Sequence, residues 1–263
     1  MRPFFSLVIF LFIVVPVCAQ GMLLCGEATP NPAAQNQVVS VTVSATQPGS
    51  LASGCGIIAV RQDSPFGPIV YQPSICPAIF ITVGPPPATV TLQWSTAVPG
   101  GFLQPGMYYI QVDYRDQNFG PAQTTHFPVR IDALGTPPPP ILSRTSAPVR
   151  GTTMGLSINA PGFGGSSYLL AASFQTNVGF TLPTGLRIAL DQDALFPFSF
   201  PAANPFLFPN FLGNLDASGN TNAPAVNLPN LPVLNGFPLA IQGALFNSMG
   251  ALTLTNPITV CIE

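Results

Sequence analysis

The single histidine is the first place to look for catalysis, because acid–base chemistry near neutral pH most often uses this residue. His126 shares the outward row of its predicted strand with Arg130, and Pro128 between them is typical of an edge strand. No G-x-S-x-G turn or comparable nucleophile accompanies it. One histidine and cysteines that should be oxidised leave no ligand set for zinc. We therefore expect a solvated edge histidine, no catalytic residue, and no metal or cofactor.

Two aspartates could act as a pair. Asp191 and Asp193 lie on the outward row of a predicted strand over 185–193, which places their carboxylates roughly 6 to 7 Å apart. Such a pair could bind calcium with nearby carbonyls, or serve as acid and base on a glycosidic bond. The aromatic and polar contacts of a sugar site are not visible around it. We favour the plainer interpretation, a solubilising strand end.

The segment 216–222 spaces oxygen-bearing side chains at alternate positions, as a calcium loop does. These side chains are Asp216, Ser218, Asn220 and Asn222. Its glycine comes two places too early for an EF-hand, and no acidic residue closes the loop, so an ordinary turn is expected. A second polar block is interpreted in the same way, as the end of a hairpin. It consists of Asp113, Arg115, Asp116 and Asn118.

Six phenylalanines lie in a segment that prolines prevent from forming a long strand. They are Phe196, Phe198, Phe200, Phe206, Phe208 and Phe211. Buried, each would contribute about 2 kcal/mol or more to a core. Exposed, they would form a patch for a partner protein, a membrane interface or a glycan. We expect core or inter-domain packing, with a partner patch as the alternative.

The first nineteen residues have the composition of a cleavable signal peptide. Arg2 precedes an apolar run over 4–15, and a small-residue pattern predicts cleavage after Ala19. The run is shorter than the about 20 residues that a spanning helix needs. An uncleaved anchor and a lipid-anchored Cys18 are the alternatives. We expect a secreted or cell-surface protein with no membrane span after cleavage.

Removal of this leader leaves four cysteines, an even set that predicts two disulfides in an exported protein. A predicted hairpin over 56–72 would bring Cys55 within two residues of Cys76. The remaining pair, Cys25 and Cys261, would tie the mature N-terminus to the last strand and hold two domains side by side. The alternative confines disulfide bonding to the first domain region and leaves Cys261 free.

The composition excludes several classes of protein. Charged side chains make up only 6% of the chain, lysine is absent and the net charge is −2, so no basic surface for nucleic acid or anionic membranes exists. Hydrophobic residues reach 47%, which is too many for a disordered chain. With 32 prolines and 24 glycines spread along the sequence, long helices are excluded and an all-β fold remains.

Residues 37–132 alternate between apolar and polar side chains with period two, as half-buried strands do. The clearest strand covers 107–114. Its inward side chains are Tyr108, Ile110, Val112 and Tyr114. About seven short strands are expected here, with turn signals between them, which is the number that a seven-stranded sandwich requires.

Part of this region resembles a known class of module. Thr-Leu-Gln-Trp at 91–94, followed by Leu-Gln-Pro-Gly at 103–106 and a tyrosine-rich strand, is similar to bacterial extracellular immunoglobulin-like and fibronectin-like β-sandwich modules. The resemblance covers 37–132 and implies a spacer or binding module rather than a chemistry. One feature departs from it, because a bridge between Cys55 and Cys76 clips one hairpin instead of joining two sheets.

The proline run at 137–140 predicts a stiff linker over 134–142, between a first domain at 20–133 and a second at 143–263. The second domain is expected to be a sandwich or jelly-roll-like unit. Its strand candidates are 152–159, 168–174, 185–193, 238–246 and 251–262. Its last hairpin resembles that of tandem β-domains in uncharacterised secreted bacterial proteins. No internal sequence repeat connects the two halves.

These observations predict a two-domain secreted protein of the bacterial cell surface or exterior, with a structural, adhesive or binding role and no enzymatic activity. Its partner stays open; another surface protein and a glycan are the options. One alternative is a glycan-binding or glycan-cleaving module that uses Asp191 and Asp193. The other is a subunit of an extracellular lattice or appendage.

Overall fold

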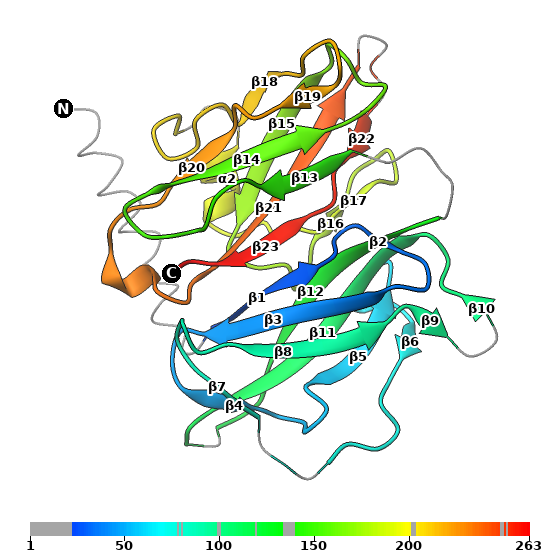
Figure 1. The fold of residues 1–263 in the computed structure, drawn as a ribbon, viewed down its shortest axis with the longest axis vertical. Coiled ribbons are helices and arrows are strands. Elements are labelled where there is room, and N and C mark those ends of the chain that lie inside the picture. The colour runs from blue at the N-terminus through cyan, green and yellow to red at the C-terminus, as the bar shows by residue number, and fades with distance from the viewer. Residues whose placement is uncertain are drawn as a thin grey trace.

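The computed structural model describes residues 23–77, 79, 81–98, 101–118, 120–133, 140–200, 204–247, 250 and 252–263. The predicted signal peptide and most of the predicted linker lie outside the described residues. Strands are the main secondary structure of the described residues, which otherwise contain one short helix, α2 (Leu195–Ser199), one 3-10 turn, η1 (Pro232–Leu234), and loops (Figure 1). The all-β prediction is confirmed.

The buried side chains form two large hydrophobic cores, one for each half of the described chain. The first draws its side chains from 24–131 and includes Trp94, Tyr108 and Phe127. The second draws them from 142–262, together with Leu23 from the other end of the chain. The exact domain boundaries stay a prediction, because the segment 134–139 between the halves is not described.

The first core lies between two sheets. One is three-stranded: β1 (Leu24–Thr29), β3 (Val38–Ala45) and β8 (Val90–Ser95) in that spatial order. The other runs in the order β6 (Ile69–Tyr71), β5 (Ile57–Gln62), β11 (Gly106–Asp116), β12 (Gln123–Asp132) and β2 (Ala33–Ala34). Along its length β11 also pairs with β4 (Gly49–Leu51), which is followed by β7 (Ile81–Val83). A small hairpin joins β9 (Ala97–Val98) to β10 (Gly101–Phe102).

Alternation explains the inner faces of these sheets. Val39, Val41 and Val43 of β3 are fully buried, while the residues between them face the other way. On β11 the expected inward row is buried, but Tyr109 on the outward row is fully buried too. This outer face is therefore covered by another part of the molecule.

The second core also lies between two sheets. One consists of β13 (Ile141–Arg144) and β14 (Thr153–Asn159), with β19 (Asn220–Thr221) and β20 (Ala225–Asn227) both beside β14. The other runs in the order β18 (Leu212–Asn214), β15 (Ser167–Ser173) and β21 (Pro238–Phe246), with β22 (Leu252–Leu254) and β23 (Ile258–Cys261) both beside β21.

The two halves have equivalent strand orders. In the first half, the two sheets are β1-β3-β8 and β6-β5-β11-β12. In the second half, the sheet β13-β14-β19/β20 corresponds to the former, and the sheet β18-β15-β21-β22/β23 corresponds to the latter. The corresponding strands also follow one another in the same order along the chain. This is the immunoglobulin-like arrangement, with an added strand at one sheet edge. The second half is thus a sandwich and not a jelly roll, and the molecule contains a structural repeat that the sequence did not reveal.

Two of the strands expected in the second half were wrong in extent. Over 185–193 only β17 (Arg187–Ile188) forms, and it pairs with β16 (Phe180–Thr181). The expected strand at 251–262 is divided into β22 and β23, because the intervening Pro257 has no N–H to donate. The candidates at 152–159, 168–174 and 238–246 match β14, β15 and β21 to within one residue.

Candidate functional site

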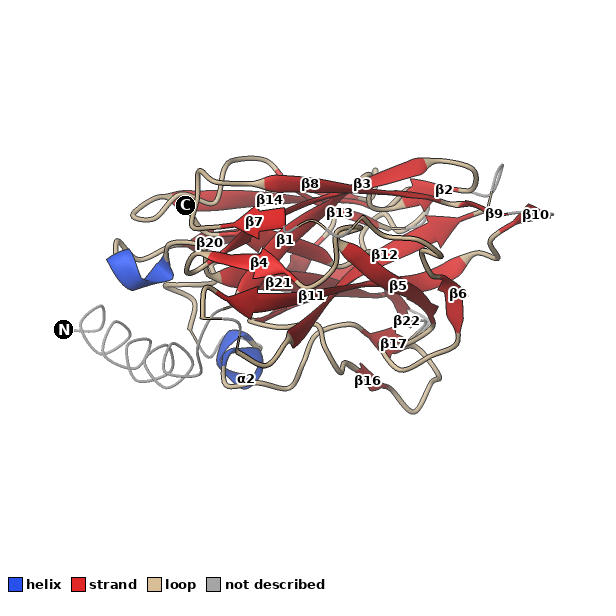
Figure 2. Cartoon of the chain, turned by 90° about the horizontal axis from the view of Figure 1, so that it is seen from below, coloured by secondary structure: helices blue, strands red, loops and turns tan. Residues whose placement is uncertain are grey.

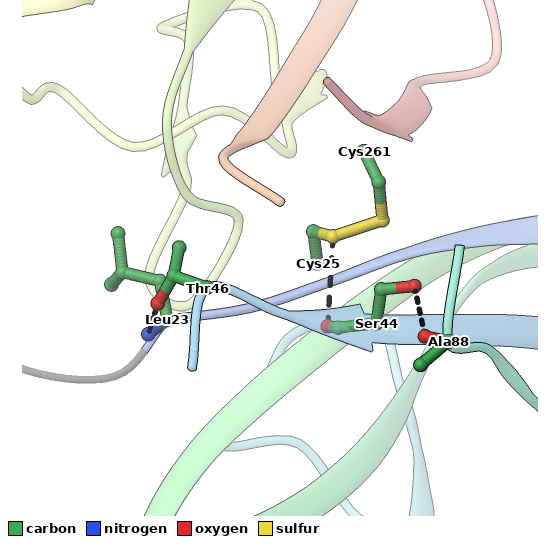
Figure 3. The surroundings of a disulfide bond; sticks show 6 residues. All are labelled: Leu23, Cys25, Ser44, Thr46, Ala88 and Cys261. Atoms are coloured by element: carbon green, nitrogen blue, oxygen red, sulfur yellow. Dashed lines mark hydrogen bonds between the residues drawn. A yellow bond between two sulfur atoms is a disulfide. The ribbon is translucent and has the colours of Figure 1, made fainter. Parts of the chain in front are cut away.

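Two disulfides join the cysteine pairs expected from the sequence. Cys25 of β1 bonds to Cys261 of β23 with a Cα–Cα distance of 5.3 Å, and Cys55 bonds to Cys76 with a Cα–Cα distance of 5.1 Å. Figure 3 shows Cys25 reaching from β1, beside Ser44 of β3, to Cys261. Strands β1 and β23 consequently lie side by side, and the first bond links the two halves (Figure 1).

Amide side chains connect the halves near this bond. The Asn31 Nδ2 group donates to the Pro257 carbonyl at 2.7 Å, and the Asn256 Nδ2 group donates to the Asn31 carbonyl at 2.9 Å. Asn256 is fully buried, and its Oδ1 atom accepts from the Leu142 N–H at 2.9 Å. Within a sheet, main-chain groups of neighbouring strands bond to each other. Across the boundary between the halves, the two asparagine side chains form the hydrogen bonds to these main-chain groups instead.

The sequence suggested that Arg130 lies on a solvated edge, but the structure shows that it does not. Its guanidinium donates to the Pro140 carbonyl at 3.2 Å and to the Leu254 carbonyl at 3.4 Å, and forms an ion pair with Asp132 at 3.1 Å. Burial lowers the pKa of Arg130, although Asp132 opposes this. The outward row of β12 is covered by the second half, so this prediction was wrong.

His126 belongs to the same covered row and is only 5% exposed. Its main-chain N–H donates to Asn177 Oδ1 at 3.0 Å, and its carbonyl accepts from Thr176 Oγ1 at 2.6 Å. Beside β12, the short strand β2 reaches only Ile131 and Asp132, so the edge at His126 has no strand partner among the described residues. Side chains from the loop after β15 supply the hydrogen-bond partners of the main-chain groups at this edge. The solvated histidine expected from the sequence is therefore a buried interface residue.

Asp191 is not on a strand; its carboxylate organises a loop. Oδ1 accepts from the main-chain N–H groups of Val178 at 2.7 Å and Gly179 at 2.9 Å, and Oδ2 accepts from Asn177 at 3.1 Å. The same loop carries the Asn177 side chain that reaches His126. Asp191 thus shapes the segment that contacts the first half.

Asp193 has a similar structural role. Its Oδ2 atom accepts from the Phe174 N–H at 2.7 Å and the Ser173 hydroxyl at 3.0 Å, while Oδ1 accepts from the Leu195 N–H at 3.0 Å at the start of α2. Burial raises the pKa of Asp193, and these hydrogen bonds oppose that rise. In the described part of the chain, no group of three or more His, Cys, Asp or Glu side chains could hold a metal ion.

The other two polar segments form turns. Asp216 Oδ1 accepts from the N–H groups of Ser218 at 2.8 Å and Asn220 at 2.9 Å. Asp116 Oδ1 accepts from Asn118 and from Gly120, both at 3.0 Å. Each carboxylate thus closes a local turn.

The six phenylalanines do not form one patch, so that alternative is wrong as stated. Phe208 and Phe211 are buried in the second core, and Phe198 packs against it. Phe196 packs on a separate small cluster and stacks on Phe200, with ring centroids 5.8 Å apart. Only Phe200, at 40%, and Phe206, at 54%, are well exposed.

A different apolar surface lies on the outer face of the sheet β18-β15-β21-β22. Strand register places its side chains on one face, opposite the core. We call this the apolar face, and it consists of Leu169, Leu212, Ala244, Phe246, Leu252 and Leu254. Leu212 is 56% exposed and Phe246 is 38% exposed. Sequence analysis missed this face, although the Leu-Ala-Ile-Gln-Gly-Ala-Leu-Phe run of β21 is largely apolar on both rows.

The segment between β15 and β18 borders this face. Figure 2 shows β16, β17 and α2 together on one side of the layered strands. Phe196 and Phe200 from this segment line a small apolar cavity of about 40 Å³ with Leu169 and Leu254 of the apolar face. The same segment contacts the first half through Asn177 and Arg187.

No family model and no curated protein matches the chain. Among solved structures, the human OSCAR ligand-binding domain is similar over 91% of this chain and 95% of that chain, with 14% identity and a TM-score of 0.24. The D00-D0 domain of intimin covers 90% of this chain and 98% of that chain, with 8% identity and a TM-score of 0.26. The fibronectin(III)-like modules of Clostridium thermocellum CbhA give 9% identity and a TM-score of 0.22, over 91% of this chain and 93% of that chain. TM-scores of this size carry no argument, so the fold assignment rests on strand pairing.

No described helix is long and apolar enough to cross a membrane.

Proposed function

We propose that this chain is a secreted, non-enzymatic binding protein of the cell exterior, and that an uncharged apolar segment of a partner protein docks on the apolar face. The main support for this proposal is the composition of the apolar face. Its six side chains contain no charge and no polar group, and they lie on four adjacent strands, so a partner can cover them without desolvating a charge.

Rigidity supports a binding role. The sheet that carries the apolar face is joined to β1 of the first half through Cys25 and Cys261. A surface held in place in this way loses little conformational entropy when a partner binds. Two disulfides also agree with the oxidising exterior that the predicted signal peptide implies.

The glycan-cleaving alternative has less support. It depends on Asp191 and Asp193 as free carboxylates, and in this structure both oxygens of each accept hydrogen bonds from the protein. Such a carboxylate would have to give up its loop contacts to act on a sugar.

The test uses a photo-crosslinking residue at Leu212, with the same residue at Phe66 as the matched control. Phe66 is 74% exposed but lies in the turn between β5 and β6, away from the apolar face. Protein displayed on or secreted by its producing cell is irradiated, and crosslinked species are identified by mass. Binding is then reconstituted with the purified partner.

A partner captured at position 212 and not at 66, whose affinity falls at least tenfold in Leu212→Asp but not in Phe66→Asp, supports the proposal. Crosslinks between copies of this chain would replace it with the lattice alternative. Equal capture at both positions would overturn it.

A further inference from the structure

The contact between β12 and the loop after β15 is made at the single histidine of the chain. Asn177 and Thr176 hold the main chain of His126, while its imidazole is enclosed between the halves. The Nδ1 atom is buried and makes no hydrogen bond with the described residues, although the Asn177 side chain lies near enough to the imidazole to favour its charged form. A neutral imidazole tolerates this site with Nδ1 as an unprotonated acceptor, whereas a protonated one needs a partner for a second N–H.

The charged groups around His126 come from three elements. Arg61 of β5 disfavours the imidazolium, and Asp113 of β11 and Asp191 of the second half favour it. The carboxylate of Asp191 already accepts three main-chain N–H groups, and Asp113 Oδ1 accepts from Gln111 and Thr124. Burial is the dominant influence and lowers the pKa of His126.

A cavity adjoins this contact. It has a volume of about 70 Å³, and its walls come from both halves: Thr124 and Thr125 beside His126, and Gln175, Thr176 and Asn177 from the facing loop. Polar and apolar side chains both line it, and its size is sufficient for water, because one water needs about 10–15 Å³ by this measure. Separation of β12 from the loop would widen this cavity beside Thr125 and Asn177 and admit solvent next to His126.

We propose that His126 is a proton-sensitive latch: acidification opens the contact between β12 and the loop at 175–177, while the Cys25–Cys261 bond keeps the halves joined. The direction follows from linkage. A histidine whose pKa is lowered in the closed state stabilises closure above its ordinary value of about 6.5, and this stabilisation is lost as pH falls through the lowered value.

Two partly buried carboxylates could confuse the result, but they act in the opposite direction. Burial raises the pKa values of Asp132 and Asp193. Their protonation therefore favours the folded state as pH falls. Opening caused by acid cannot come from these groups.

The experiment measures hydrogen exchange by mass spectrometry in the disulfide-bonded protein between pH 7.5 and pH 4.5, corrected for intrinsic rates. The peptides followed are those that cover β12 and 174–191. In the wild type, their protection should fall by up to about tenfold per pH unit between the free and lowered pKa values. His126→Gln keeps a neutral side chain at every pH and should show no such fall, whereas Asp193→Asn should retain it.

Protection that is independent of pH in the wild type would overturn the proposal, and so would a pH dependence that persists in His126→Gln. If that variant does not fold, the imidazole C–H resonance of the wild type supplies the second measurement, since only one histidine exists. Its titration midpoint should lie below about 6.5 and coincide with the exchange midpoint. A midpoint at or above this value would reject the latch.

Discussion

The guanidinium of Arg187 in the second half lies over the ring of Tyr109 in the first, 5.9 Å from its centroid, and its Nε donates to the Tyr109 hydroxyl at 3.3 Å. A further guanidinium nitrogen donates to the Val178 carbonyl. This contact closes the outer face of β11 and explains why Tyr109 is fully buried on a row that alternation assigns to solvent.

Removal of this pair should weaken the interface. Arg187→Ala should lower the free energy of unfolding by about 1 to 2 kcal/mol, from one hydrogen bond and one cation–π contact. Chemical denaturation measures the loss, and Arg115→Ala on an exposed position of β11 is the control. A double-mutant cycle with Tyr109→Phe should give a coupling of about 1 kcal/mol, and zero coupling would contradict the assigned contact.

The two disulfides should differ in their contribution to stability. By the chain-entropy model, Cys25–Cys261, with a sequence separation of 236, contributes about 5 kcal/mol, and Cys55–Cys76, with a separation of 21, about 3 kcal/mol. Paired Cys→Ser variants compared by denaturation measure both values. Equal losses would show that native-state contacts, and not loop length, determine the effect.

Asn256 should be among the most sensitive polar positions. Asn256→Ala removes the partners of Asn31 and Leu142 in a fully buried site, so a loss of about 2 to 3 kcal/mol is expected. Asn222→Ala, on the exposed turn after β19, is the matched control and should change stability by less than about 0.5 kcal/mol. Similar values for the two variants would rule out the structural role assigned to Asn256.

Asp193 should titrate above the ordinary aspartate value of 3.8, because burial raises its pKa. The sign is opposite to that of His126: this group favours folding most below pH 3.8, and that contribution is lost as pH rises through the raised value. Carbon-detected NMR of the carboxyl group measures the midpoint. A midpoint below 3.8 would mean that its hydrogen bonds outweigh burial. At neutral pH, Asp193→Ala should still cost about 1 to 3 kcal/mol, because the Phe174 N–H loses its partner.

The apolar face should bind a hydrophobic dye in the native protein. Leu212→Asp should reduce the fluorescence of bound dye with no loss of stability, because the replaced side chain is 56% exposed. Phe66→Asp removes an exposed apolar side chain that lies outside the face and should have the smaller effect. The opposite ranking would place the main hydrophobic surface at the β5–β6 turn.

The sequence by itself determined the class of fold and the local strand pairing. Period-two alternation identifies a strand and its buried row without reference to any partner, which is why β3, β11, β14 and β21 could be predicted. The hairpin of β5 and β6 places Cys55 near Cys76 through local geometry alone. The bond from Cys25 to Cys261 followed only because those two cysteines remained.

Tertiary structure decided what covers the outward rows. Alternation predicts that one row of a strand is buried but contains no information about a second sheet or loop on the other side. His126 was for that reason predicted to be solvated; Arg130 and Tyr109 also lie on outward rows, and the second half covers all three side chains. The same limit hid the strand-order repeat, since the two halves share spatial neighbours but not side chains. Contacts between residues far apart in the chain, such as Asn31 with Asn256, form only when both sandwiches have folded and packed together.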